Sequence, residues 1–332
     1  MKRLRKLFLI AEVGSVHDGS FGNACKLVEL SKECGASAVK FQLHDAENET
    51  IKNAPNPSYF NTEKRYDYFK RTSFNPEQLL NLKKLSKKLG LKFIVSPFSI
   101  ESANLLKKLN IDGYKIASGE VTNHPLLEVI SSFKKDVYLS SGMSNYKEIH
   151  QAIKILNKKN TTLMQCTSEY PCPVDKVGLN VLHKFKKYDC VLGLSDHSIG
   201  IAAAVSFIAN GASVIEKHIT FSKKMYGSDA SHSMEPKEFK IFSKEIHDAF
   251  KIYESNIDKN NIKKFLKMRK TFQKSIYTKN SIDKNEIFSL ENISFKKPDT
   301  GISAKLYKKV IGKFSKKKLK KDYKLKFEDL KI

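Results

Sequence analysis

The sequence has few of the features that mark disulfide-rich, zinc-structured or membrane proteins. None of its five cysteines lies in a Cys-x-x-Cys pair, so we expect reduced thiols and no disulfide framework or structural zinc site. Its apolar runs, such as Ile201–Ala209, are far shorter than the ~20 residues that span a bilayer. The basic N-terminus begins like a signal peptide, but Glu12 interrupts the apolar stretch before any small-residue cleavage site. We therefore expect a cytoplasmic protein with no membrane partner.

Arginine is also scarce, although the chain is strongly basic. The net charge is +25, yet only five of the 60 basic residues are Arg, at positions 3, 5, 65, 71 and 269. Proteins that read base edges favour the bidentate fork of Arg, and here the lysines are spread along nearly every helical stretch. We therefore expect no specific nucleic-acid partner. A barrel that binds carbohydrate or nucleic acid without catalysis is a second hypothesis, supported only by the charge.

The chain alternates short apolar runs with amphipathic stretches up to about residue 250. The runs predict eight strands: Phe8–Val13, Ala38–Gln42, Lys92–Ser96, Gly113–Ile116, Val137–Ser140, Thr162–Gln165, Val191–Ser195 and Val214–His218. The amphipathic stretches predict helices at Asn23–Cys34, Pro76–Leu89, Glu101–Leu109, Pro125–Phe133, Lys147–Asn157, Gly200–Ala209 and Pro236–Phe250. A doubly wound sheet would alternate similarly, but eight strand–helix units favour an α/β fold of the (β/α)₈ TIM-barrel type.

Changes in pattern define the domain organisation. We assign residues 1–255 to the barrel, 256–270 to a polar linker and 271–332 to a small β-rich domain with turn signals between short apolar pieces. Residues 43–75 form an aromatic, turn-rich insertion after the second strand, long enough to act as a lid.

Polar residues occur at or just after the end of every predicted strand. They include Glu12, Lys40, Gln42, Ser96, Lys115, Ser118, Glu120, Ser140, Thr167, Ser168, Tyr170, Ser195, His197, Glu216 and His218. Taken singly, each has an ordinary structural explanation, and Glu216 could simply pair with Lys217. However, the carboxyl ends of barrel strands surround one mouth, so eight polar ends that each follow apolar residues predict a single active site.

The residue types indicate the chemistry of this site. Lys40 and Lys115, with the hydroxyls of Ser118, Ser140 and Ser195, suit a small anion that carries a phosphate and a carboxylate. His197 and His218 could hold one divalent metal, with Glu12 or Asp229 near its open positions. Two imidazoles favour Mn²⁺ over Mg²⁺, and Co²⁺ is also compatible. Glu12 and Glu120 are candidate acid/base groups, whereas His17 and His232 are expected to be structural.

Eight stretches of the barrel resemble the sialic acid synthase family. They are "IAEVGSVHDG", "GASAVKFQ", "SPFS", "YKIASGE", "LSSGMS", "QCTSEYP", "GLSDHSIG" and "VIEKHITF…GSDASHSMEP". The tail from Lys274 to Lys313 resembles the antifreeze-like SAF module of these synthases. Members condense phosphoenolpyruvate with an N-acylated mannosamine-type sugar to give a nonulosonic acid.

The resemblance implies roles for individual residues. The phosphoenolpyruvate ligands would be Lys40, Lys115, Ser118, Ser140, Thr167, Ser168 and Ser195. The sugar would face Gln42, Glu120, Tyr170 and Asp229. His197 and His218 would hold the metal that polarises the sugar aldehyde, His218 would thereby take part in catalysis, and Glu12 would handle the proton of the attacking water.

The resemblance also implies a homodimer in which the SAF module of one chain caps the barrel of its partner. The usual Arg-Pro motif of that module reads "FKKPDTG" here, so Lys297 stands in place of Arg, and Val16 replaces a frequent Asn. Lys cannot make the planar bidentate contact of Arg. The acceptor therefore stays open between precursors of N-acetylneuraminic, legionaminic and pseudaminic acid. An eight-carbon product from a pentose phosphate is a further alternative, against which the SAF-like tail argues.

Overall fold

The chain divides into two compact units, which we describe separately. The computed structural model describes residues 6–56 and 62–331. The first unit is Met1–Ser255 and the second is Asn256–Ile332. Residues 57–61 of the predicted insertion lie outside the described part of the chain. No helix in the described ranges is long and apolar enough to cross a membrane.

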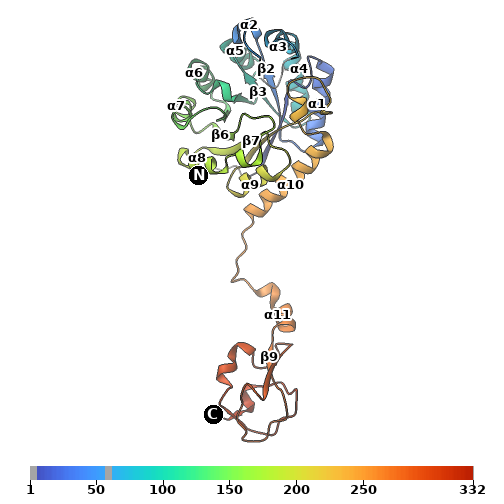
Figure 1. Cartoon of the computed structure of the whole chain (residues 1–332), viewed down its shortest axis with the longest axis vertical. Coiled ribbons are helices and arrows are strands. Elements are labelled where there is room, and N and C mark those ends of the chain that lie inside the picture. The colour runs from blue at the N-terminus through green and yellow to red at the C-terminus, as the bar shows by residue number, and fades with distance from the viewer. Residues whose placement is uncertain (1–5, 57–61, 332) are drawn as a thin grey trace. The chain divides into compact units, whose positions relative to one another are not determined.

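The first unit is a closed barrel of eight parallel strands surrounded by helices (Figure 1), which confirms the predicted fold. Its strands are β1 (Phe8–Gly14), β2 (Ala38–Leu43), β3 (Lys92–Pro97), β4 (Gly113–Ile116), β5 (Asp136–Ser140), β6 (Thr161–Cys166), β7 (Val191–Asp196) and β8 (Val214–His218). The main helices are α1 (Phe21–Glu33), α4 (Pro76–Lys88), α5 (Ile100–Lys108), α6 (His124–Ser132), α7 (Tyr146–Leu156), α8 (Leu179–Phe185), α9 (Ala202–Ala209) and α10 (Pro236–Glu254).

The helices begin where the sequence supplies caps. Asn75 and Gln78 form a capping box at α4, with Pro76 at the first helical position, and Asn145 with Glu148 does the same at α7. The sequence did not predict α8, because its seven residues make fewer than two full turns of helical periodicity.

Alternation along the strands separates two apolar layers. Leu9, Ala11 and Val13 of β1 point outward into the core between barrel and helices, whereas Ile10 belongs to a small cluster inside the barrel. That inner cluster includes Ala38, Ile94, Tyr138, Met164 and Val214. The residue two positions further along each of these strands also points inward. Those positions are Glu12, Lys40, Ser96, Ser140, Cys166 and Glu216, so the polar site lies directly above the apolar plug.

The insertion after β2 has some helical structure of its own. It contains α2 (Ala46–Glu49) and α3 (Arg65–Thr72). His44 lies just before α2 and stacks between Phe69 and Phe98, with ring centroids 3.7 and 4.2 Å away. These contacts attach the insertion to the end of β3.

The second unit is small and built largely from turns. Helix α11 (Leu266–Phe272) precedes two short antiparallel pairs, β9 (Ser275–Thr278) with β10 (Ile293–Lys296) and β11 (Phe314–Ser315) with β12 (Leu330–Lys331). Its separate core consists of Ile276, Ile282, Phe288, Ile293, Ile302, Val310, Leu319, Leu325 and Leu330. The predicted linker 256–270 thus includes the first five of the seven residues of α11.

Candidate active site

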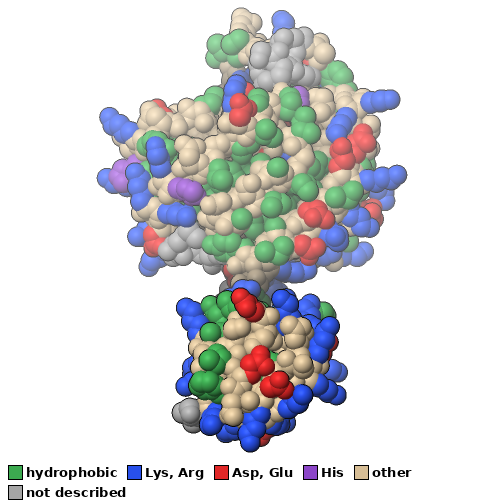
Figure 2. All heavy atoms as spheres, turned by 60° about the horizontal axis from the view of Figure 1, so that its bottom comes forward, with side chains coloured by type: hydrophobic (Ala, Val, Ile, Leu, Met, Phe, Trp, Pro, Cys, Tyr) green, Lys and Arg blue, Asp and Glu red, His purple; other side chains and the backbone are tan. Residues whose placement is uncertain are grey.

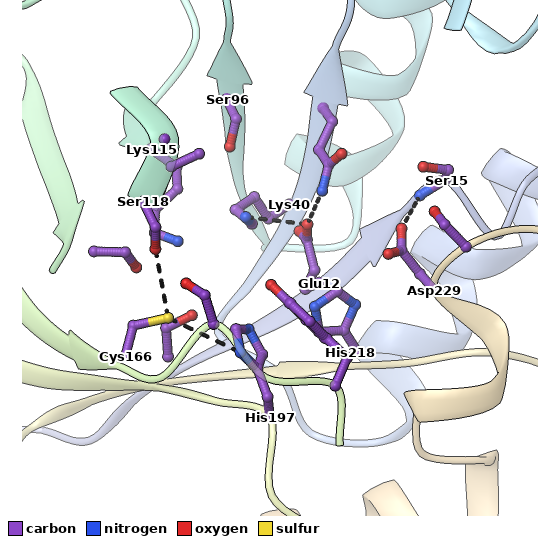
Figure 3. A pocket seen from close by; sticks show the side chains of 18 of the residues that line it. Glu12, Ser15, Lys40, Ser96, Lys115, Ser118, Cys166, His197, His218 and Asp229 are labelled. Carbon is purple, nitrogen blue, oxygen red and sulfur yellow. Dashed lines mark hydrogen bonds and ion pairs between the residues drawn. The ribbon is translucent and has the colours of Figure 1, made fainter. Parts of the chain in front are cut away.

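A cavity of about 380 Å³ lies at the carboxyl end of the barrel strands. Parallel register brings the strand ends together, since Glu12 pairs with Lys40 on one side and with His218 on the other. Figure 3 shows these side chains gathered around one space. The predicted site residues that line the cavity are Glu12, Lys40, Gln42, Lys115, Ser118, Ser140, Ser168, Tyr170, Ser195, His197, His218 and Asp229.

Two predicted site residues of the first unit, Thr167 and Glu120, do not line this cavity. The Thr167 hydroxyl instead donates to the Lys176 carbonyl at 2.8 Å. Glu120 accepts a hydrogen bond from the Asn123 amide at 2.8 Å. Lys297 belongs to the second unit, where its Nζ lies 5.2 Å from the centre of the Phe272 ring.

The floor of the cavity is a buried cluster of four charged side chains. The Nζ of Lys115 lies 2.9 Å from Glu216 Oε1, and the Nζ of Lys40 lies 3.1 Å from Glu12 Oε1 and 3.4 Å from Glu216 Oε1. Ser195 also donates to Glu216, at 2.9 Å. Each buried ammonium group thus has a carboxylate partner, which offsets part of the cost of removing its charge from water.

The two carboxylates of the cluster differ in their ionisation. Burial raises the pKa of Glu12 to about 7, an effect that Lys40 partly opposes and that the negative charge of Glu216 increases. Burial also acts on Glu216, but Lys115 and Lys40 together hold its pKa well below the usual range. Glu216 is thus the permanent counter-ion of the lysines, whereas Glu12 can exchange a proton near neutral pH.

Several hydroxyls around the cluster lack hydrogen-bond partners. The Oγ atoms of Ser96, Ser140 and Ser168 are buried and unpaired among the described residues. Buried polar atoms in native proteins are nearly always bonded, so unpaired hydroxyls in a cavity indicate a polar ligand. Gly142 adopts φ +25°, and a side chain there would collide with Ser118, so the glycine keeps this wall open.

Two imidazoles stand next to each other at the cavity wall. The ring centroids of His197 and His218 are 5.7 Å apart. The Nδ1 of His197 lies 2.9 Å from the Thr167 carbonyl; if it donates there, Nε2 keeps its lone pair. The Nδ1 of His218 is buried and has no partner in the described ranges, and burial lowers the pKa of this ring to about 3. The two imidazoles, with nitrogen atoms available, could together hold one metal ion, although no group of three or more His, Cys, Asp or Glu in the described part of the chain forms a metal cluster.

Asp229 lines the same cavity as the two imidazoles. Its Oδ2 accepts from the Ser15 amide at 2.8 Å, and Gly14 permits this approach, since any Cβ there would strike the carboxylate. The Tyr170 ring centroid lies 4.1 Å from that of His197. His17 and His232, which we expected from the sequence to be structural, do not line the cavity. The His17 ring packs on Phe74, with 4.4 Å between ring centroids, and the His232 ring centroid lies 6.0 Å from that of Tyr170.

Some cavity residues were not assigned roles from the sequence. Cys166 points at the site between Ser118 and His197 (Figure 3), at 3.6 and 3.9 Å. Burial alone would raise its pKa, but the His197 ring and Lys115 lower it to about 7. Its inward position follows from the alternation along β6. His44, Arg65 and Phe69 of the insertion and Phe98, just after β3, also line the cavity, and no periodic pattern in the sequence predicted this.

Glu216 does not pair with Lys217, contrary to the structural explanation considered from the sequence. Adjacent strand residues point to opposite faces. Lys217 points outward, where its Nζ lies 2.8 Å from Asp196 Oδ2 and also donates to the Ser198 carbonyl. Asp196 Oδ1 in turn accepts from the Ser198 hydroxyl at 2.7 Å. This buried pair joins β7 to β8 directly behind the two imidazoles.

Comparisons with known proteins identify the family of each part of the chain. The NeuB family model matches residues 27–258, and the SAF domain model matches residues 273–331. An N,N'-diacetyllegionaminic acid synthase of Campylobacter jejuni is 36% identical over 96% of this chain and 98% of its own length. The human N-acetylneuraminate-9-phosphate synthase is 35% identical over 70% of this chain and 67% of its own.

A solved structure is also similar over most of the chain. An N-acetylneuraminic acid synthetase from Leptospira borgpetersenii, in complex with citrate, superposes with a TM-score of 0.71 at 29% identity, covering 81% of this chain and 93% of that one. The fold, the matched models and the relatives together show that the chain belongs to the NeuB family and carries a C-terminal SAF domain.

Proposed function

We propose that this protein condenses phosphoenolpyruvate with an N-acyl mannosamine-type sugar to give a nonulosonic acid and phosphate. The observation that supports it best is the cavity floor, where two buried lysines lie among serine hydroxyls that have no partner among the described residues, beside two imidazoles. Donors of this number and charge suit an anion with a phosphate and a carboxylate. The relatives named as synthases of sugar acids support the same class of reaction.

In this proposal Lys40 and Lys115 hold the donor, and Ser140 and Ser168 supply further hydrogen bonds to its oxygens. Ser118 and Ser195 complete this set. The acceptor lies against Gln42, Tyr170 and Asp229. A divalent ion on His197 and His218, for which we favour Mn²⁺, would act as a Lewis acid toward the acceptor aldehyde.

In the proposed condensation, Glu12 is the protein side chain that exchanges a proton. The C3 carbon of phosphoenolpyruvate bonds to the aldehyde carbon, whose oxygen takes up a proton from solvent, and C2 becomes cationic. Water adds to C2, and Glu12 accepts one proton of that water. The C2–O bond to phosphate then breaks while the new C2 hydroxyl gives its proton to the departing phosphate, which leaves the 2-keto group. Gln42 donates to Glu12 Oε1 at 2.8 Å, which leaves Oε2, unpaired in the described structure, for this proton.

The SAF domain suggests the assembly in which this reaction occurs. We propose a homodimer in which this domain of one chain, with Lys297, completes the acceptor site of the partner. We also assign the reaction to the cytoplasm.

The experiment is to measure phosphate release from phosphoenolpyruvate with a panel of N-acyl mannosamine-type sugars, before and after EDTA and again after added Mn²⁺. We expect release with at least one sugar, loss with EDTA and recovery with Mn²⁺. If no sugar supports phosphate release, the proposed acceptor class is wrong. If EDTA leaves the rate of phosphate release unchanged, the proposed metal requirement is wrong. Salt-dependent retention on nucleic acid without turnover would favour a non-catalytic binding protein instead.

The variant His218→Ala tests whether this imidazole serves turnover or only stability. The His218 Nδ1 has no hydrogen-bond partner to lose among the described residues, so thermal stability should change little, whereas turnover should fall by about 100-fold or more. Equal losses of melting temperature and turnover would show that this ring is structural.

A further inference from the structure

Three residues of the insertion after β2, His44, Arg65 and Phe69, form one wall of the cavity, and several contacts hold His44 in place. His44 is held between two aromatic rings, and its two ring nitrogens lie 2.7 Å from Glu49 Oε2 and 3.0 Å from Gln42 Oε1. Gln42 itself contacts Glu12 in the floor. The wall is therefore tied to the reaction centre and can position a ligand accurately.

Arg65, the first residue of α3, is the cation of this wall. Its side chain lines the cavity, is 37% exposed, and lies with Cζ 5.4 Å from the centre of the Phe69 ring. A guanidinium group has five N–H donors. Only one bonds within the described structure, from Nη2 to Glu49 at 3.3 Å, and Nε is buried without a partner. Most of its donors therefore have no partner among the described residues.

Two carboxylates lie close to Arg65. Glu49 accepts its hydrogen bond, and Glu120 lies near enough that Glu49 and Arg65 both influence its ionisation. One guanidinium group therefore stands beside two carboxylates. A phosphate placed here would meet more repulsion than attraction, whereas an uncharged oxygen would gain a donor. Phe69 and Phe98 add apolar surface beside it.

We propose that Arg65, with Phe69 and Phe98, binds an uncharged acylamino group at the end of the acceptor remote from the aldehyde, and that this wall disfavours a phosphorylated acceptor. The carbonyl oxygen of the acyl group accepts from the guanidinium, and its methyl group packs on the aromatic rings. This inference rests on the proposed function and specifies its acceptor. It assigns the chain to free sugars with a second acylamino group.

The test compares three acceptors by the loss of phosphoenolpyruvate absorbance. They are a mannose-type sugar with acetamido groups at C2 and C4, N-acetylmannosamine, and N-acetylmannosamine 6-phosphate. We expect kcat/KM to be about tenfold or more higher for the diacetamido sugar than for N-acetylmannosamine, and lowest for the phosphate. A phosphate that matches or exceeds either neutral sugar would overturn the proposal. If no acceptor consumes phosphoenolpyruvate, the proposed function fails and this inference fails with it.

Variants separate the role of Arg65 from a general loss of activity. Arg65→Met should lower kcat/KM about tenfold or more for the diacetamido sugar but much less for N-acetylmannosamine, and Arg65→Lys should not restore the difference. Lys70→Met removes a positive charge from the same helix outside this cavity and should leave the ratio unchanged. Glu120→Gln should raise the relative use of the phosphate. Equal losses on all acceptors in Arg65→Met, with the fold intact by circular dichroism, would contradict the assignment.

Discussion

At the scale of single residues, Glu12 shows how position determines chemistry. Its carboxyl group is fully buried, shares Lys40 with Glu216, and keeps one oxygen unpaired in the described structure. The raised pKa, about 7, means that the ionised form is disfavoured in the folded state. Its stabilising contribution is therefore present below the ordinary pKa of 4.5 and is lost as the pH rises through about 7.

This ionisation predicts a pH dependence. If Glu12 accepts a proton from water, kcat/KM should rise with pH through an apparent pKa near 7. Glu12→Gln should lower turnover by about 100-fold and remove this rise. Chemical denaturation of both proteins between pH 5 and 8 should show the wild type losing stability relative to the variant as the pH increases. A variant that retains the same pH profile would exclude Glu12 as the base.

At the scale of elements, the ends of β7 and β8 are joined by the Lys217–Asp196 pair. Both side chains are at most 2% exposed, and the pair lies on the outward face of the barrel wall. Each of these residues is the chain neighbour of one imidazole, so the pair holds the two strand ends that carry His197 and His218.

Breaking this pair should be costly. Lys217→Met leaves the Asp196 carboxylate buried without its partner and should lower the free energy of unfolding by about 3–5 kcal/mol. The double variant with Asp196→Asn should cost less than the sum of the single changes, because no charge stays buried. Urea unfolding measures both values. Lys223→Met, in an exposed ion pair with Glu238, is the control and should cost less than about 1 kcal/mol. Equal costs for the two lysines would refute the argument.

At the scale of the whole molecule, charge and apolar surface have different distributions. The lysines and arginines visible in Figure 2 are spread around both units, as their distribution along the sequence predicted. The start of the second unit, in contrast, exposes large apolar side chains. Leu266, Met268 and Phe272 are each more than half exposed, and Ile257 is 65% exposed. Such surface typically marks a protein interface, and a second copy of the chain is the partner that we propose.

This surface predicts a dimer that charge can disrupt. The full chain should have the mass of a dimer by light scattering at micromolar concentration. Leu266→Asp combined with Met268→Asp should weaken the dimer by about 100-fold or more, since burial of each side chain contributes about 1.5–3 kcal/mol. Lys267→Asp on the same helix is the control for added negative charge. A monomeric wild-type chain would refute the dimer, and an unaffected double variant would exclude this surface as the interface.

The sequence alone determined the barrel and most of the cavity lining. Alternation of apolar runs predicts β1 to β8, and period-two geometry places Lys40, Ser140 and Ser195 on the inner face, because these patterns are local properties of the chain. The tertiary structure decided which groups pair. Glu216 contacts Lys115, which is 101 residues away, and not its neighbour Lys217. It also decided that His44 and Arg65 enter the cavity while Thr167 and Glu120 do not line it. Such contacts depend on strand register and loop packing between distant segments, and no local pattern encodes them.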